Sequence, residues 1–245
     1  MPTPEIRVFK NLEELSRGAV EEFVTLARQS HPGGAPFSAA LSGGSTPKRF
    51  YELLATGEFS SQAPWQRIEL FQVDERCVPP DDARSNYKMM REALLDRIPG
   101  IHFHRMAAGQ PDRDAAARSY AAELRSALGA QPRGWPRLDV IYLGMGDDGH
   151  TASLFPGTPA LDEMELAVVP NYVPKFEMYR LTLTLPVLNA AGRVVFLVSG
   201  AGKAERLRQA LRTPSGATPP FPSQLVNPEH GAVAWYVDEA AAELL

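Results

Sequence analysis

The stretch LDVIYLGMGDDGH, residues 138–150, runs from an apolar segment straight into a turn that is rich in glycine and acidic residues. The segment LDVIYL is apolar almost throughout and does not alternate with polar residues, which is typical of a strand buried on both faces. Such strands occur in parallel sheets that helices cover on both sides. This stretch therefore predicts an α/β fold.

The same order of strand, polar turn and helix recurs on both sides of this stretch. The residue pattern predicts strands at 8–9, 37–41, 68–73, 138–144, 166–170, 179–185, 193–200 and 232–237. It predicts helices at 11–29, 47–55, 85–98, 112–128, 203–211 and 238–245, and loops at 31–36 and 213–223. The alternation predicts a single-domain, doubly wound, Rossmann-like α/β fold over residues 1–245, with a mainly parallel sheet and helices on both faces.

Composition restricts the class of protein and of partner. The chain has 245 residues, 44% hydrophobic and 22% charged, which is ordinary for a soluble globular protein. A net charge of −4 without blocks of like charge argues against nucleic acid or a membrane surface as partner. With one cysteine, Cys77, no leader-like start and no apolar run near ~20 residues, we expect a cytoplasmic protein, a monomer or weak homodimer.

Polar or glycine-rich segments follow four of the predicted strands, at 42–46, 74–76, 144–151 and 199–203. Because ligands of open α/β sheets bind at the carboxyl ends of the strands, these four segments are expected to meet at one crevice.

The segment SGGSTP (42–47) has the features of an anion site. Gly43 and Gly44 let the backbone approach a ligand, and Ser45 and Thr46 add hydroxyl groups. With Thr46 as N-cap and Pro47 at the first helical position, the following helix would direct its free N–H groups to the same place. The alternative is a flexible turn with an ordinary N-cap.

Two further segments carry cations. SGAGKAE (199–205) places Lys203 beside glycines without the spacing of a Walker A motif, and VDER (73–76) places Asp74 and Arg76 directly after a buried strand. Either set is compatible with a solvated surface. In the predicted crevice, the lysine and arginine would instead bind an anion, and Asp74 would be an acid/base candidate.

GMGDDGH (144–150) contains a literal G-x-G-x-x-G, which raises the alternative of a dinucleotide loop. We reject it, because Asp147 and Asp148 would repel a pyrophosphate and because Pro156 and Gly157 leave room for roughly two helical turns at most.

The same turn is better explained as catalytic. A histidine side chain ordinarily titrates near neutral pH, so His150 is suited to accept a proton from water, with Asp148 orienting the imidazole. The alternative is a histidine that merely bonds its own turn. His102 and His104 form an H-x-H pair without a third ligand of suitable spacing, so we expect surface or loop positions and no metal site.

Five segments in this order resemble the 6-phosphogluconolactonase family, which shares a superfamily with the glucosamine-6-phosphate deaminases. The segments are ALSGGSTPKRFYELL, FQVDERCVPPDDARSNYKMMREALL, LDVIYLGMGDDGHTASLFPGTPAL, YRLTLTLPVLNAAGRVVFLVSGAGKAE and AVAWYVDEAAA.

The resemblance implies hydrolysis of 6-phospho-D-glucono-1,5-lactone to 6-phospho-D-gluconate in the pentose phosphate pathway, without metal or cofactor. It implies His150 as the general base with Asp148 beside it, and Asp74 at the position of a proton-transferring carboxylate of the deaminases. Substrate contacts are implied for the Gly43–Thr46 loop, Arg76, Lys203 and Arg180.

Two other functions remain as alternatives. A glucosamine-6-phosphate deaminase resembles D-G-H-I-A-F-N-E-P at the catalytic turn, whereas this chain has DGHTASLFP, with Phe155 in place of the relay glutamate. A non-catalytic sugar-phosphate sensor on the same fold would be expected to lose the base, and this chain keeps both Asp148 and His150.

Overall fold

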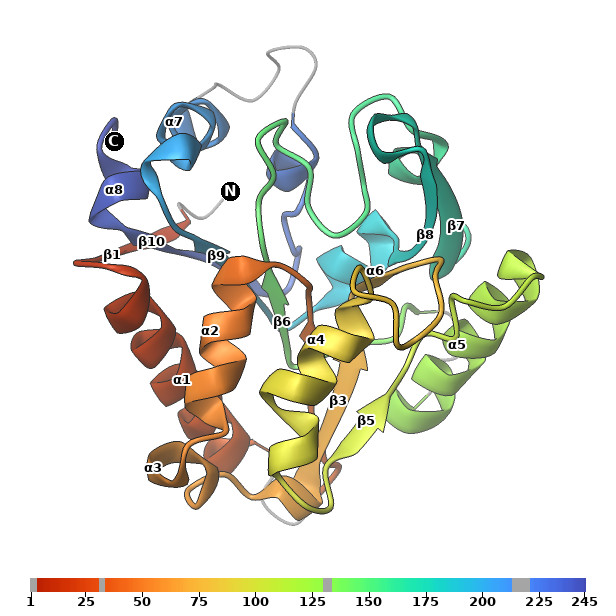
Figure 1. The fold of residues 1–245 in the computed structure, drawn as a ribbon, viewed down its shortest axis with the longest axis horizontal. Helices are drawn as coiled ribbons and strands as arrows, with labels where there is room; N and C mark the ends of the chain where they lie inside the picture. Colours follow the sequence, from red (N-terminus) through yellow and green to blue (C-terminus); the bar gives the residue numbers. More distant parts are fainter. Residues whose placement is uncertain (1–3, 31–33, 130–133, 213–220) are drawn as a thin grey trace.

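Seven parallel strands form the central sheet of the computed structural model, which describes residues 4–30, 34–129, 134–212 and 221–245 (Figure 1). Their order is β1-β10-β9-β6-β2-β3-β5, and every neighbouring pair is parallel. The strands are β1 (Glu5–Phe9), β2 (Phe37–Leu41), β3 (Ile68–Gln72), β5 (His102–His104), β6 (Val140–Leu143), β9 (Arg193–Val198) and β10 (Ala232–Asp238). The predicted parallel α/β sheet is therefore confirmed.

Helices cover both faces of this sheet. Along β6, for example, Val140 and Tyr142 belong to one apolar core and Ile141 and Leu143 to the other, because successive side chains of a strand point to opposite faces. One core includes α1 (Leu12–Gln29), α2 (Ser45–Leu54), α3 (Gly57–Ser60) and α4 (Asn86–Ala93). The other includes α5 (Arg113–Leu128), α6 (Leu185–Ala190), α7 (Ala204–Arg212) and α8 (Glu239–Ala242).

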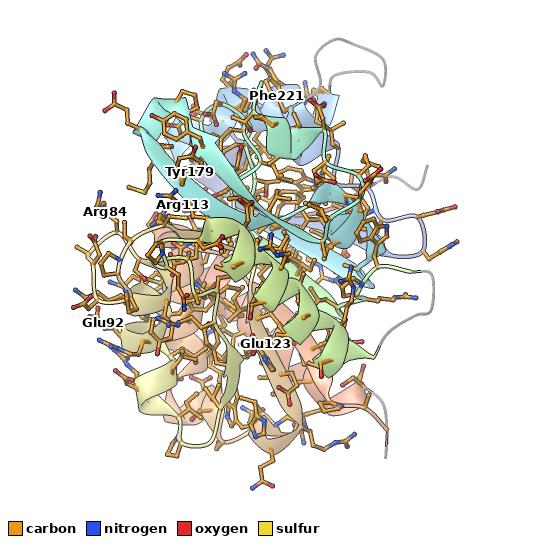
Figure 2. The ribbon with its side chains drawn as sticks, turned by 90° about the vertical axis from the view of Figure 1, so that its right-hand side faces the viewer. Arg84, Glu92, Arg113, Glu123, Tyr179 and Phe221 are labelled. Atoms are coloured by element: carbon orange, nitrogen blue, oxygen red, sulfur yellow. The ribbon has the colours of Figure 1, made fainter. Side chains whose placement is uncertain are left out.

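A second, antiparallel sheet lies beside the first, with the order β4-β8-β7 (β4, Asp74–Arg76; β8, Met178–Leu183; β7, Val168–Val173). The strands expected at 166–170 and 179–185 are thus not part of the parallel sheet, and VDER is a strand and not a loop. Figure 2 shows Arg113 of α5 beside Tyr179 of β8, where the guanidinium lies 4.4 Å from the ring centre. This contact joins the small sheet to the α5 face.

Other boundaries differ from the sequence-based expectation. The helix expected at 85–98 ends at Ala93 and is followed by the 3-10 turn η2 (Leu95–Arg97), and His102 and His104 lie on β5 and not in a loop. The remaining 3-10 turns are η1 (Trp65–Arg67), η3 (Pro159–Leu161), η4 (Pro174–Phe176), η5 (Ala201–Lys203) and η6 (Pro222–Gln224). Parts of the loops expected at 31–36 and 213–223, namely 31–33 and 213–220, lie outside the described residues.

The order of the strands creates a topological switch point between β2 and β6. The chain leaves β2 toward β3 on one side and leaves β6 toward β9 on the other, so the loops after β2 and β6 diverge at the carboxyl edge of the sheet. A crevice at such a point is where ligands of this architecture bind. Figure 1 shows the segment after β6 rising between α7 and the β7–β8 hairpin. None of the helices in the described residues is both long and apolar enough to span a membrane.

Candidate active site

A cavity of about 230 Å³ lies at this switch point. Its wall is formed by the segments after β2, β6 and β9 together with β4 and β8. The four polar segments at 42–46, 74–76, 144–151 and 199–203 therefore do meet at one cavity, as predicted. Nine of the residues predicted for the site line it: Gly43, Gly44, Ser45, Thr46, Asp74, Arg76, His150, Arg180 and Lys203. Asp148 lies directly behind this wall.

The loop after β2 brings the first turn of α2 to the cavity. Gly44 has a φ of +119°, a conformation that disfavours any side chain, and it is the residue that precedes the helix. Gly44 is thus the N-cap residue and the helix begins at Ser45. The predictions that Thr46 is the N-cap and Pro47 the first helical residue are wrong. A Cβ atom on Gly43 would lie 1.8 Å from Oδ1 of Asn86, so glycine is required there as well.

The loop after β6 forms a pair between His150 and Asp148. Oδ1 of Asp148 lies 2.5 Å from Nδ1 of His150 and also accepts the His150 backbone N–H at 3.2 Å. An ionised carboxylate only accepts hydrogen bonds, so Nδ1 carries the proton and Nε2 is the basic nitrogen. Gly146 is packed against this pair, because a Cβ there would lie 2.0 Å from Nδ1 of His150.

The carboxylate of Asp148 also forms an ion pair with a lysine from another element. Nζ of Lys175, in η4 of the β7–β8 hairpin, lies 3.0 Å from Oδ2 of Asp148. Partial burial opposes ionisation of Asp148, but the hydrogen bonds and charges of His150 and Lys175 outweigh it and lower the pKa of this carboxyl well below its ordinary value. Asp148 is therefore an anion at neutral pH.

An aromatic corner supports His150 and Arg180. The imidazole of His150 stacks on the ring of Phe155 with the ring centres 3.9 Å apart. The guanidinium of Arg180 lies 5.2 Å from the ring centre of Phe155 and 4.8 Å from that of Phe176. Phe155 is thus a hydrocarbon support beneath the imidazole.

Asp74 lines the cavity but has no contact with His150 like that of Asp148. Its Oδ2 accepts the Ser153 hydroxyl at 2.6 Å, and Asn86 donates to its backbone oxygen at 3.0 Å and to its Oδ1 at 3.3 Å. Sequence reasoning left open which aspartate orients His150. The structure places Asp148, and not Asp74, against the imidazole.

Glu75, the next residue, is a buried anchor. Its carboxylate accepts five hydrogen bonds, which fix the turn before α4 to β4 and so position Asn86 in the cavity wall. The donors are Gln72 Nε2, Ser85 Oγ and the backbone N–H groups of Arg76, Asn86 and Tyr87. Because both carboxylate oxygens are occupied in this way, Glu75 has no capacity left for acid/base work.

The cationic residues of the cavity have different partners. Arg76 donates through one terminal nitrogen to Arg84 O at 2.5 Å, while the buried Nε atoms of Arg76 and Arg180 have no hydrogen-bond partner in the described part of the chain. Burial lowers the pKa of Arg180, and the charge of Asp74 opposes that effect. An anion in the cavity would satisfy such donors.

Lys203 is engaged differently. Its ammonium group is paired with the carboxylate of Asp147, and the same interaction lowers the pKa of Asp147. Arg206 of α7 holds the backbone oxygen of Asp147 at 2.8 Å. The lysine is therefore next to the turn that carries His150, and a bound anion would compete with Asp147 for it.

Three residues of this site were missed by sequence reasoning: Asn86, Ser153 and Lys175. Asn86 and Ser153 are buried polar residues in ordinary-looking segments, and Lys175 lies in a turn whose approach to Asp148 depends on the small antiparallel sheet. The only available signal was the SN dipeptide downstream of VDER.

The remaining candidates carry no site. His104 lies between Glu69 at 2.7 Å and Glu123 at 2.6 Å, and within the described ranges no histidine, cysteine or acidic cluster is arranged to hold a metal ion. Burial raises the pKa of the Cys77 thiol to about 11, against a smaller opposing effect of Arg113, so this thiol is protonated at neutral pH.

Comparisons with known proteins agree with this architecture. The family model described as glucosamine-6-phosphate isomerases/6-phosphogluconolactonase matches residues 10–235. A 6-phosphogluconolactonase of Nostoc sp. is 42% identical over 212 residues, 85% of each chain, and the human 6-phosphogluconolactonase is 40% identical over 98% of this chain and 93% of its own. The structure of 6-phosphogluconolactonase from Trypanosoma cruzi superposes with a TM-score of 0.87 at 32% identity, covering 99% of this chain and 97% of that one. The chain therefore belongs to the glucosamine-6-phosphate isomerase/6-phosphogluconolactonase family.

Proposed function

We propose that this chain hydrolyses 6-phospho-D-glucono-1,5-lactone to 6-phospho-D-gluconate, with His150 as the base that activates water. The observation that carries the proposal is the Asp148–His150 pair in the cavity wall, in which Nδ1 is engaged at 2.5 Å and Nε2 is left as the proton acceptor. The relatives named 6-phosphogluconolactonase, at 40–42% identity, support the same substrate.

The reaction needs few groups. Nε2 of His150 takes a proton from water as its oxygen bonds to the lactone carbonyl carbon, and the resulting oxyanion is stabilised by donors in the cavity. The bond from this carbon to the ring oxygen then breaks, and the imidazolium returns the proton to the ring oxygen. The sum is the addition of one water, and the histidine ends the cycle neutral.

The phosphate of the substrate would supply orientation. The first turn of α2, from Ser45, presents free N–H groups and the positive end of its dipole to the cavity. Arg76, Arg180 and Lys203 add positive charge to the same cavity. Binding energy from a phosphate remote from the carbonyl can thus fix the lactone against His150.

Deamination of glucosamine 6-phosphate is the second candidate, because the same anion-binding loops would serve it. Opening an aldose ring requires a proton relay, and the position beneath His150 that a relay glutamate would take is filled by the Phe155 ring, 3.9 Å from the imidazole. A lactone carbonyl is already electrophilic and needs no such relay. This observation favours the lactonase.

The deciding experiment supplies freshly generated 6-phosphogluconolactone with EDTA present and follows coupled oxidation of the product, with the spontaneous rate subtracted. We expect a rate far above background that is lost in His150→Ala. Product formation at the spontaneous rate, together with ammonia release from glucosamine 6-phosphate, would replace the lactonase by the deaminase. Failure of both assays would point to a sugar-phosphate sensor.

A further inference from the structure

Lys175 reaches the catalytic pair from a segment that the sequence does not connect with it. It lies in η4, at the tip of the β7–β8 hairpin, where Glu177 adopts a left-handed turn with φ +48°. This turn sets Nζ of Lys175 3.0 Å from Oδ2 of Asp148, in the loop after β6. Lys175 is not among the residues that line the cavity.

The structure assigns Lys175 as a positioning residue of the Asp148–His150 pair, which orients Asp148 and offsets its charge. This inference rests on the proposed lactonase function for its kinetic part. Lys175, Asp148 and His150 form a line of three groups in which the carboxylate uses Oδ2 toward the lysine and Oδ1 toward the imidazole.

The geometry explains why a carboxylate beside a base needs such a partner. An unopposed anion 2.5 Å from Nδ1 stabilises the imidazolium and so removes the free base at a given pH. A cation on the far oxygen of the same carboxylate weakens this stabilisation while leaving the hydrogen bond that fixes the tautomer. With Lys175 in place, Asp148 can still orient the imidazole through its hydrogen bond, while its negative charge acts less strongly on the imidazole.

The other charged groups around His150 come from different elements and would be unchanged in a Lys175 variant. Asp74 and Arg76 of β4, Arg180 of β8 and Lys203 of η5 line the cavity with His150, and Asp147 is next to Asp148 in the same loop. Any displacement of the pH profile on removing Lys175 is therefore attributable to the Lys175–Asp148 contact.

The expected effect follows from charge and distance. An ammonium group and an imidazolium on the two oxygens of one half-exposed carboxylate change each other's titration by about 0.5–1 pH unit. Lys175→Met keeps most of the length of the side chain while removing its charge, and with the charge the cation–π contact of Nζ with the Phe176 ring. We expect the acid limb of its kcat/KM profile to move up by about 0.5–1 unit, which is a threefold to tenfold loss on that limb.

Two matched variants define the comparison. Lys175→Arg retains a cation at Asp148 and should restore the parent profile. Lys10→Met makes the same change of net charge at an exposed lysine next to β1, outside the cavity wall, and should leave the profile unchanged. KM should be nearly the same in all three variants, since Lys175 does not line the cavity.

An NMR titration of the His150 imidazole gives a second readout that needs no substrate. A midpoint raised by Lys175→Met and restored by Lys175→Arg supports the inference even if the parent shows no lactonase activity, in which case the proposed function alone fails. An unmoved midpoint with an unmoved acid limb would overturn it. A raised KM with an unmoved midpoint would also overturn it and make Lys175 a substrate contact.

Discussion

Gly146 provides a test of the proposed general base, because a single methyl group at this position would displace His150. An ideal Cβ at this position would lie 2.0 Å from Nδ1 and 2.1 Å from Cε1 of His150, and 2.9 Å from Oδ1 of Asp148. Ordinary contacts begin near 3.4 Å, so the imidazole of Gly146→Ala must move by about 1.4 Å, the difference between 3.4 and 2.0 Å. The backbone of Gly146 is not in the left-handed region, so alanine itself suits the position.

The size of the effect follows from this displacement. Misplacing a catalytic group by about 1 Å costs roughly 100-fold in rate, so we expect kcat to fall by about 100-fold, equivalent to about 2.7 kcal/mol of transition-state stabilisation. Overpacking should lower the free energy of unfolding by only about 1–3 kcal/mol, which leaves the protein folded at the assay temperature.

The assay is the coupled measurement of lactone hydrolysis, with thermal unfolding followed by circular dichroism on the same samples. Gly202→Ala is the matched control, because a Cβ on Gly202 meets no atom within 4 Å and Gly202 does not line the cavity. A folded Gly146→Ala enzyme with kcat within about threefold of the parent would refute the reasoning, since His150 would then not need its observed position.

The other predictions concern the anchors of the site. Asp148→Asn should lower kcat by about 100-fold or more in the coupled assay by releasing the His150 tautomer. Because the pKa of Asp148 is lowered in the folded protein, its contribution to stability is complete above about pH 5. That contribution is lost as the pH falls through the folded value, so thermal melts of Asp148→Asn should decline less than those of the parent below pH 4. Glu75→Gln should lower the free energy of unfolding in urea by about 2–4 kcal/mol, because a buried carboxylate that accepts five hydrogen bonds becomes an amide with one acceptor oxygen. Arg76→Ala and Lys203→Ala should mainly raise KM and weaken inhibition by inorganic phosphate; unchanged phosphate inhibition would contradict the anion-binding assignment.

Most of the parallel sheet was predictable because six of its seven strands carry their own signal; the three-residue edge strand β5 was missed. FSAAL and VIYL are buried at every position, and a strand buried on both faces needs no alternation to be recognised. The carboxyl ends of such strands share one edge of the sheet, so Gly43, His150 and Lys203 could be brought together from strand direction alone. The other lining residues of the loops after β2, β6 and β9 were predictable in the same way.

The small antiparallel sheet was not predictable because its pairing is non-local. The three residues of β4 pair with Arg180 to Thr182 of β8, about a hundred positions later, and no local pattern marks β4 as a strand or as the partner of β8. Lys175 was missed with that sheet, because it reaches Asp148 only through the β7–β8 hairpin. Arg180 also reaches the cavity as a residue of β8, but the family resemblance had already named it. The start of α2 was misplaced for a different reason, since the positive φ of Gly44 makes a side-chain cap unnecessary.

The strand order has a consequence for how the protein acquires its activity. The cavity takes its wall from residues 42 to 203, and the strands that carry them meet in an order that differs from their order along the chain. A partly assembled sheet that lacks β9 would hold His150 without Lys203, and one that lacks the β7–β8 hairpin would hold it without Arg180. After dilution from denaturant, enzymatic turnover should therefore recover later than the helical circular dichroism signal. The rate at which turnover returns would then report the last step in which these segments dock.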